Sequence, residues 1–121
     1  MDGRRVIAVD FDGTLYDRGK CAEEPAERFE ISTLPDMANQ AVIRYVRAQH
    51  VLGHFIVVYT ARPREDRARI EYWLDLMGVP FDIVQCGKLR YDMLIDDRTM
   101  RPEEVENAEH HQGRGAPYQT V

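Results

Sequence analysis

The sequence predicts an α/β fold with a mostly parallel sheet in a single domain. Two unbroken apolar runs, Val6–Val9 and Phe55–Tyr59, are rich in β-branched and aromatic residues, which is typical of strands buried on both faces. Segments with helical periodicity alternate with such runs, and this alternation indicates parallel strands joined by crossover helices. A length of 121 residues suits one domain with an ordinary hydrophobic core.

The helices are expected from apolar residues that recur every three to four positions. This spacing predicts helices over residues 37–49 and 64–77, and it places Trp73 in the core. Gly78 follows the second of these helices and suits its end. A third helix is expected to begin at Pro102, because acidic residues follow it in the first turn, near the positive end of the helix dipole.

Two further strands and two irregular segments complete the expected chain. Short apolar runs predict a third strand at 81–84 and a fourth at 91–95. Residues 16–36 are polar and too few for a folded domain, so a loop or flap is expected there. Residues 110–121 are rich in glycine and polar residues, and a flexible tail or an edge strand is expected.

Composition narrows the class of protein. The formal net charge of −5 argues against a chain built to neutralise many phosphates, although it leaves a nucleic-acid end open as a substrate. No apolar run approaches the ~20 residues of a membrane span, so we expect no membrane contact and a cytoplasmic location. Cys21 and Cys86 are too few for a disulfide framework and are expected to be ordinary reduced thiols.

The chain is organised around two carboxylates that follow the first strand. Asp10 and Asp12 end the run that begins at Val6, and Gly13 then permits a tight turn or a close approach to a ligand. An Asp-Gly turn alone is a common local structure. A calcium loop is rejected, because Thr14, Leu15 and Cys21 stand where that loop needs an acid or Asn, a Gly and a Glu.

Polar side chains follow each of the four expected strands. Thr60 ends the second strand, Lys88 follows the third, and Asp96-Asp97 end the fourth. Taken one at a time, Thr60 could be a helix cap, Lys88 a surface lysine, and Asp96-Asp97 solvated acids of a loop. Because the carboxyl ends of parallel strands meet at one edge of a sheet, we expect these groups and Asp10 to lie together.

Such a group suits phosphoryl chemistry. Clustered carboxylates repel one another and favour a bound cation, and Mg²⁺ prefers carboxylate oxygens and bridges to phosphate. Thr60 can donate a hydrogen bond to a phosphoryl oxygen, and Lys88 supplies a positive charge. One Asp can act as a nucleophile while a second carboxyl transfers protons.

The run Asp10-Phe11-Asp12-Gly13-Thr14-Leu15 resembles the first motif of the haloacid dehalogenase (HAD) superfamily. Thr60, Lys88 and Asp96-Asp97 are similar to its second, third and fourth motifs, in that order. The resemblance covers about residues 6–98. It implies a Rossmann-like, three-layer fold without a separate cap domain, because only short segments separate the motifs.

The resemblance also implies a role for each motif residue. Asp10 would be the nucleophile of a Mg²⁺-dependent phosphatase and Asp12 its general acid and base. Thr60, Ala61 and Lys88 would bind the substrate phosphate. Mg²⁺ would be held by Asp10, by Asp12 through its backbone carbonyl, and by Asp96 with support from Asp97.

The substrate stays open at this point. Thr60-Ala61-Arg62 and Ile95–Thr99 are also similar to the phosphatase half of phage polynucleotide kinases, and small capless phosphatases of surface-sugar synthesis are similar as well. The expected substrate is therefore a phosphorylated sugar, a nucleotide or a nucleic-acid end. An open site also suits a cap lent by a second subunit, in a homo-oligomer.

Two other classes of function compete with a phosphatase. A phospho-receiver signalling module also uses acids, Thr and Lys on a parallel sheet, but the strand at 81–84 is followed by no acceptor Asp before Lys88. A non-catalytic subunit that binds phosphorylated ligands is the third reading. It is disfavoured because every side chain needed for catalysis is present.

Overall fold

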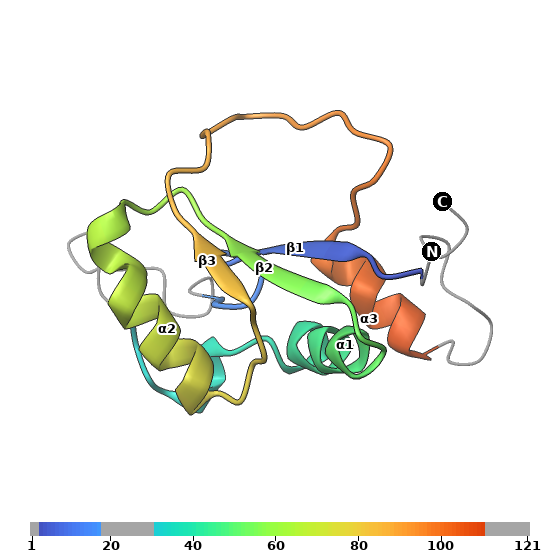
Figure 1. The fold of residues 1–121 in the computed structure, drawn as a ribbon, viewed down its shortest axis with the longest axis horizontal. Helices are drawn as coiled ribbons and strands as arrows, with labels where there is room; N and C mark the ends of the chain where they lie inside the picture. Colours follow the sequence, from blue (N-terminus) through green and yellow to red (C-terminus); the bar gives the residue numbers. More distant parts are fainter. Residues whose placement is uncertain (1–2, 18–30, 111–121) are drawn as a thin grey trace.

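The computed structural model describes residues 3–17 and 31–110 (Figure 1). Three parallel strands form an open sheet in the order β1-β2-β3: β1 (Val6–Asp10), β2 (Phe55–Tyr59) and β3 (Ile83–Gln85). Helices connect the strands. The protein therefore has the small α/β, Rossmann-like fold with a parallel sheet that the sequence predicts.

Two crossover helices connect the strands, and a third packs against the first. These are α1 (Gln40–Val51), α2 (Arg67–Leu76) and α3 (Pro102–His110). Each crossover helix is preceded by a short 3-10 turn, at Pro35–Met37 and at Arg64–Asp66. The predicted helices are therefore confirmed, but α1 begins at Gln40 because Asn39 caps it by accepting a hydrogen bond from the Val42 N–H at 3.3 Å.

All three helices lie on the same side of the sheet, and residues 86–101 lie on the other (Figure 1). The strand order accounts for this arrangement. Crossovers between parallel strands are nearly always right-handed, so strands added in one direction place their helices on one face. The residues that face the helices are buried or partly buried, and they are Ile7, Val9, Ile56, Val58 and Val84.

The opposite face of the sheet is partly open, which corrects the expectation of strands buried on both faces. On this face Val6 is 69% exposed, Ile83 is 39% exposed and Ala8 is also exposed, while Phe55 and Val57 are partly covered. An apolar strand sequence indicates that the strand is buried, but it does not show whether helices cover one face of the sheet or both.

Three aromatic side chains form the part of the core beneath the carboxyl end of β1. The Phe11 and Tyr16 rings stack with centroids 5.3 Å apart, and both meet Trp73 edge-on at 5.3 and 5.7 Å. The Trp73 indole N–H donates to the Ser32 carbonyl at 3.0 Å, and the Ser32 N–H donates to the Tyr16 hydroxyl at 2.8 Å. Trp73 is fully buried, as predicted, and it anchors the turn that follows β1.

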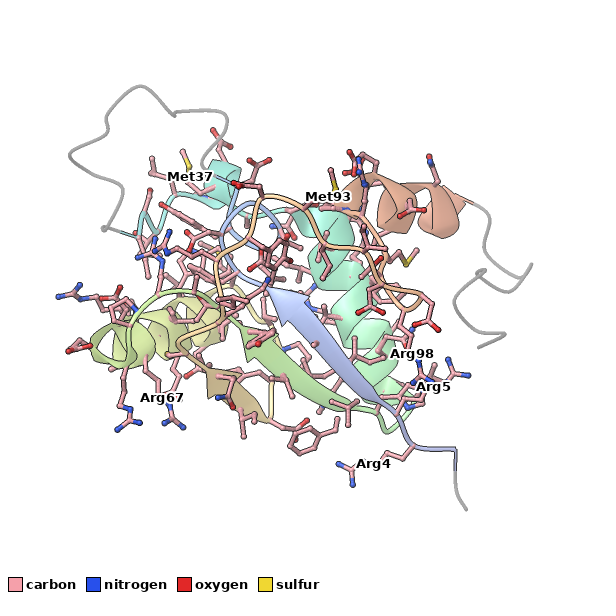
Figure 2. The ribbon with its side chains drawn as sticks, turned by 90° about the horizontal axis from the view of Figure 1, so that it is seen from above. Arg4, Arg5, Met37, Arg67, Met93 and Arg98 are labelled. Carbon is pink, nitrogen blue, oxygen red and sulfur yellow. The ribbon has the colours of Figure 1, made fainter. Side chains whose placement is uncertain are left out.

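The predicted fourth strand at 91–95 is wrong. Residues 86–101 run without helix or strand from β3 to α3, and Figure 2 shows Met93 and Arg98 on this irregular segment. Within the described residues β1 and β3 are the edges of the sheet, and 91–95 pairs with neither of them. Strand propensity reflects how well a side chain fits a pleated surface, and it does not show whether a neighbouring strand is available for pairing.

Some expectations concern residues that the structure does not describe. The tail or edge strand expected at 110–121 lies outside the described residues, except for His110 at the end of α3, and so do most of the 16–36 flap and Cys21. Cys86 is described as a free cysteine, and burial raises the pKa of its thiol. None of the described helices has the length and apolar character needed to cross a membrane.

Candidate active site

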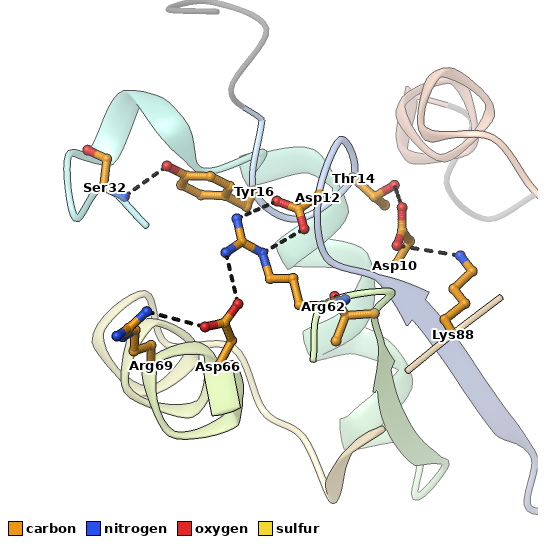
Figure 3. Close-up of polar contacts among 10 residues, drawn as sticks. Asp10, Asp12, Thr14, Tyr16, Ser32, Arg62, Asp66, Arg69 and Lys88 are labelled. Carbon is orange, nitrogen blue, oxygen red and sulfur yellow. Dashed lines mark hydrogen bonds and ion pairs between the residues drawn. The ribbon is translucent and has the colours of Figure 1, made fainter. Parts of the chain in front are cut away.

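Asp10 ends β1 at the carboxyl edge of the sheet, where its carboxylate meets a cation (Figure 3). The Lys88 Nζ lies 3.5 Å from Asp10 Oδ1, and the Thr14 hydroxyl donates to Oδ2 at 3.4 Å. The Asp10 side chain is 37% exposed and that of Lys88 is 16% exposed. The carboxylate is thus held by its neighbours and still reachable from solvent.

The charge state of Asp10 is set by opposing effects. Burial raises the pKa of the Asp10 carboxyl, Lys88 lowers it through its charge and hydrogen bond, and the charge of Asp12 raises it again. The net result is a raised pKa. Lys88 therefore limits a shift that burial would otherwise make larger.

Asp12 is held by a buried arginine. The Arg62 Nε donates to Asp12 Oδ2 at 2.8 Å and its Nη2 donates to Oδ1 at 2.9 Å, which is a two-point contact between planar groups (Figure 3). The Arg62 side chain is 7% exposed and that of Asp12 is 44% exposed. Asp12 therefore faces solvent with its carboxylate fixed from behind.

Arg62 is itself fixed by the start of the second crossover. Its Nη1 lies 3.5 Å from Asp66 Oδ2, and its guanidinium carbon lies 5.7 Å from the centre of the Phe11 ring. Arg69 donates to the other Asp66 oxygen at 3.2 Å. Burial lowers the pKa of Arg62, but the hydrogen bonds and charges of Asp12 and Asp66 outweigh it, so the pKa is raised and the cation persists.

The ends of β2 and β3 are tied together behind these side chains. The Lys88 N–H donates to the Thr60 carbonyl at 2.8 Å, and the Gly87 N–H donates to the Arg62 carbonyl at 3.0 Å. Gly87 has a φ of +81°, a conformation that other residues rarely adopt, and it turns the chain so that Lys88 returns toward β1. The Thr60 hydroxyl is buried and accepts the Arg62 N–H at 3.1 Å.

The structure gathers some of the predicted site residues and not others. Asp10, Asp12, Thr60 and Lys88 come together at the carboxyl edge of the sheet, with Ala61 half-buried in the turn after Thr60.

Asp96 and Asp97 are not part of this cluster. Both are exposed on the segment 86–101, where an Asp96 oxygen accepts the Arg98 N–H at 3.0 Å. Within residues 3–17 and 31–110, no three His, Cys, Asp or Glu side chains gather closely enough to hold a metal ion.

Arg62 and Asp66 are site residues that the sequence pattern did not identify, although Arg62 stands in the run Thr60-Ala61-Arg62. One signal was available: a cation two residues after Thr60 and an acid four residues after that cation stand where a strand passes into a helix. Neither spacing identifies Asp12 as the partner of Arg62, because that contact spans fifty residues of sequence. Only the folded sheet reveals it.

Comparison with known proteins finds similarity to a solved structure. No protein-family model and no curated protein matches the chain. A crystal structure of a structural-genomics target from Vibrio cholerae is similar, with 30% sequence identity, a TM-score of 0.62, and coverage of 89% of this chain and 94% of that chain. Its description states no function. Because the identity extends over nearly all of both chains, this protein belongs to the same family as the Vibrio cholerae protein.

Proposed function

We propose that the protein is a phosphomonoester hydrolase of the HAD type that forms an aspartyl-phosphate on Asp10. The observation that supports this most is the Asp10 carboxylate at the carboxyl end of β1, 3.5 Å from the Lys88 ammonium and partly open to solvent. A nucleophile and a phosphate-binding cation stand side by side there. The resemblance of Asp10–Leu15 to the first HAD motif supports the same reading.

Two groups would bind the phosphoryl group. Lys88 would exchange its contact with Asp10 for one with a phosphoryl oxygen, since the side chain is long and partly exposed. The Thr60 hydroxyl accepts a hydrogen bond from the Arg62 N–H, so its own proton is left to donate. Thr60 directly follows β2 and Lys88 lies three residues beyond β3, and the hydrogen bond from the Lys88 N–H to the Thr60 carbonyl holds the two residues together.

In the first step an Asp10 oxygen attacks phosphorus and the bond from phosphorus to the leaving oxygen breaks. The leaving oxygen takes a proton, which we assign to the carboxyl of Asp12. Arg62 donates to both Asp12 oxygens, a geometry that fits the ionised carboxylate. A protonated Asp12 must therefore give up one of these hydrogen bonds while it acts as the acid.

In the second step water attacks the phosphorus of the aspartyl-phosphate, and the bond to Asp10 breaks. The proton of this water passes to Asp12, inorganic phosphate leaves, and Asp10 returns as a carboxylate. The arrangement of Arg62 and Asp12 fits this step directly, because an ionised Asp12 is the form that accepts a proton.

The expected Mg²⁺ site does not fit the described arrangement. The Asp10 oxygens are the hard donors that Mg²⁺ prefers. However, Asp96 and Asp97, the other two carboxylates expected to hold the ion, lie on the exposed segment 86–101, and no cluster of three potential ligands forms among the described residues. Magnesium dependence remains an implication of the resemblance, and the steps above use only side chains of this chain.

Phosphate release from a panel of aryl, sugar and nucleotide monophosphates tests the proposal, with Mg²⁺ and with a chelator. We expect release by the wild type and loss of at least ~10³-fold in Asp10→Asn, because the nucleophile is gone. Asp92→Asn is the matched control, since Asp92 is exposed on the segment 86–101. Release that survives Asp10→Asn would assign the chemistry to another group. Binding without release would favour a phosphate-binding subunit.

A further inference from the structure

Two half-exposed tyrosines flank the cation at the site, and the steps above leave them unused. The Lys88 Nζ lies 5.3 Å from the ring centres of both Tyr59 and Tyr91. Tyr59 is the last residue of β2, and Tyr91 lies three residues beyond Lys88 on the segment 86–101. Two rings from distant parts of the sequence therefore meet at one ammonium group.

The sheet register places Tyr59 next to the proposed nucleophile. Asp10 pairs with Tyr59 across β1 and β2, and residues paired in this way direct their side chains to the same face. This is the open face of the sheet, which no described helix covers. Tyr59 is 37% exposed and Tyr91 is 46% exposed, so both rings keep free surface beside Asp10 and Lys88.

Apart from Asp10 and Lys88, the sheet residues beside the Tyr59 ring are mostly apolar. Val57 precedes Tyr59 by two positions on the same face and is partly covered, and Ala8, which pairs with Val57, is exposed. Gln85 pairs with Tyr59 and is exposed, so it adds one amide at the rim. A group joined to the phosphate would therefore meet flat aromatic and aliphatic surface with few polar partners.

We propose that Tyr59 and Tyr91 bind the leaving group and select phosphomonoesters whose leaving group carries an aromatic ring. A phosphate held by Lys88 places its ester oxygen next to both tyrosines. An aromatic ring can stack on their free surface and bury apolar area there, whereas a short polyol cannot. This inference rests on the proposed function, because it assumes that the phosphate binds at Asp10 and Lys88.

Two kinds of substrate carry such an aromatic ring. In an aryl phosphate the ring is bonded directly to the ester oxygen, and in a nucleotide the ring is a nucleobase carried by a ribose. Binding measurements separate them without any turnover. One pair of probes is phenylphosphonate against methylphosphonate on the wild type. The other pair is a nucleoside 5′-monophosphate against ribose 5-phosphate on Asp10→Asn, which keeps the tyrosines and lacks the nucleophile.

We expect the aromatic member of at least one pair to bind roughly tenfold more tightly than its partner, a typical effect of ring stacking. This ratio should fall toward one in Tyr59→Leu and in Tyr91→Leu, and it should persist in Tyr59→Phe, which keeps the ring. Tyr72→Leu is the matched control, because Tyr72 is 63% exposed on α2 and lies on the helical side of the sheet. Any displacement of Lys88 affects both members of a pair, so the ratio isolates the rings.

Several outcomes would overturn the inference. Equal binding of both members in both pairs means that no aromatic selection exists, even if phosphate release confirms the phosphatase. A ratio that survives both leucine substitutions, or that falls equally in Tyr72→Leu, assigns selection to another surface. If the ratio behaves as expected while no panel member releases phosphate, the proposed function fails and the tyrosines belong to a binding site.

Discussion

The guanidinium of Arg62 donates two hydrogen bonds to the carboxylate of Asp12, at 2.8 and 2.9 Å, across fifty residues of sequence. The contact joins the turn after β1 to the turn after β2. Arg62 is buried and Asp12 is not, so the pair presents one fixed, solvent-exposed carboxylate close enough to Asp10 for its charge to raise the Asp10 pKa. This relationship makes Arg62 a positioning residue in the proposed mechanism.

Substituting Arg62 by Lys should lower kcat by about tenfold or more with a smaller change in KM. Lysine keeps the positive charge, but it cannot donate two parallel hydrogen bonds to one carboxylate, so proton transfer by Asp12 suffers. Steady-state kinetics on one aryl phosphate measures the split. Arg67→Lys serves as the control, since Arg67 pairs with Glu71 on the exposed side of α2. A loss confined to KM would place Arg62 in phosphate binding instead.

Substituting Lys88 by Met should move the acidic limb of the pH profile of kcat/KM to higher pH. Burial raises the pKa of Asp10, and Lys88 is the largest influence that lowers it, so removing Lys88 should raise the pKa further. Asp10 must be ionised to attack, and ionisation then requires a higher pH. The profile of Lys88→Arg should keep its limb near that of the wild type. A limb that moves to lower pH contradicts this account of Asp10.

Asp10→Asn should raise the melting temperature at pH 7, and the gain should shrink as the pH falls. A pKa raised in the folded state means that folding favours the protonated carboxyl, so stability is lost as the pH rises through that pKa. Asparagine removes the charge and with it this loss. Thermal unfolding at pH 7 and at about pH 4.5 measures the difference. Asp92→Asn, at an exposed position, should show no such dependence.

Trp73→Ala should destabilise the protein by about 3–5 kcal/mol, the usual cost of removing a fully buried indole. It removes both edge-on ring contacts and the hydrogen bond to the Ser32 carbonyl. Tyr72→Ala, which truncates the neighbouring exposed residue, should change stability little. Urea unfolding followed by circular dichroism compares the two. Equal losses would show that the aromatic cluster beneath β1 contributes no special stability.

The resemblance predicts that chelation of Mg²⁺ abolishes phosphate release and that added Mg²⁺ restores it. It further predicts that Asp96→Asn raises the Mg²⁺ concentration needed for half-maximal rate, because a carboxylate ligand is lost. In the described structure Asp96 is exposed on the segment 86–101. An unchanged Mg²⁺ requirement in Asp96→Asn would show that Asp96 stays in its exposed position during the reaction and does not bind Mg²⁺.

The sequence predicts the elements of this fold that depend on local pattern. The two apolar runs are strands, with β1 reaching one residue further, to Asp10, and the stripe containing Trp73 is a buried helix face. The fourth strand at 91–95 could not be tested by pattern alone, because a strand exists only where an edge accepts it. The open face of the sheet could not be predicted from the sequence either, since it follows from the order of the strands.

The residues of the candidate site also divide into those that the sequence predicts and those that it does not. Asp10, Thr60 and Lys88 could be placed together, because the ends of parallel strands meet at one edge. The partner of Asp12 could not be predicted, since Arg62 reaches it from the turn after β2, where Asp66 holds the other side of the guanidinium. The position of the two tyrosines beside Lys88 could not be predicted either, because Tyr91 lies on an irregular segment.

The most direct test of the central claim is to trap the covalent intermediate. Protein mixed with an aryl phosphate and quenched in acid would be digested, and the peptide that contains Asp10 would be examined by mass spectrometry. We predict one phosphoryl group on Asp10, with more of it in Asp12→Asn, which lacks the base for the second step. Rapid phosphate release with no phosphoryl group on Asp10 in either protein would contradict the account.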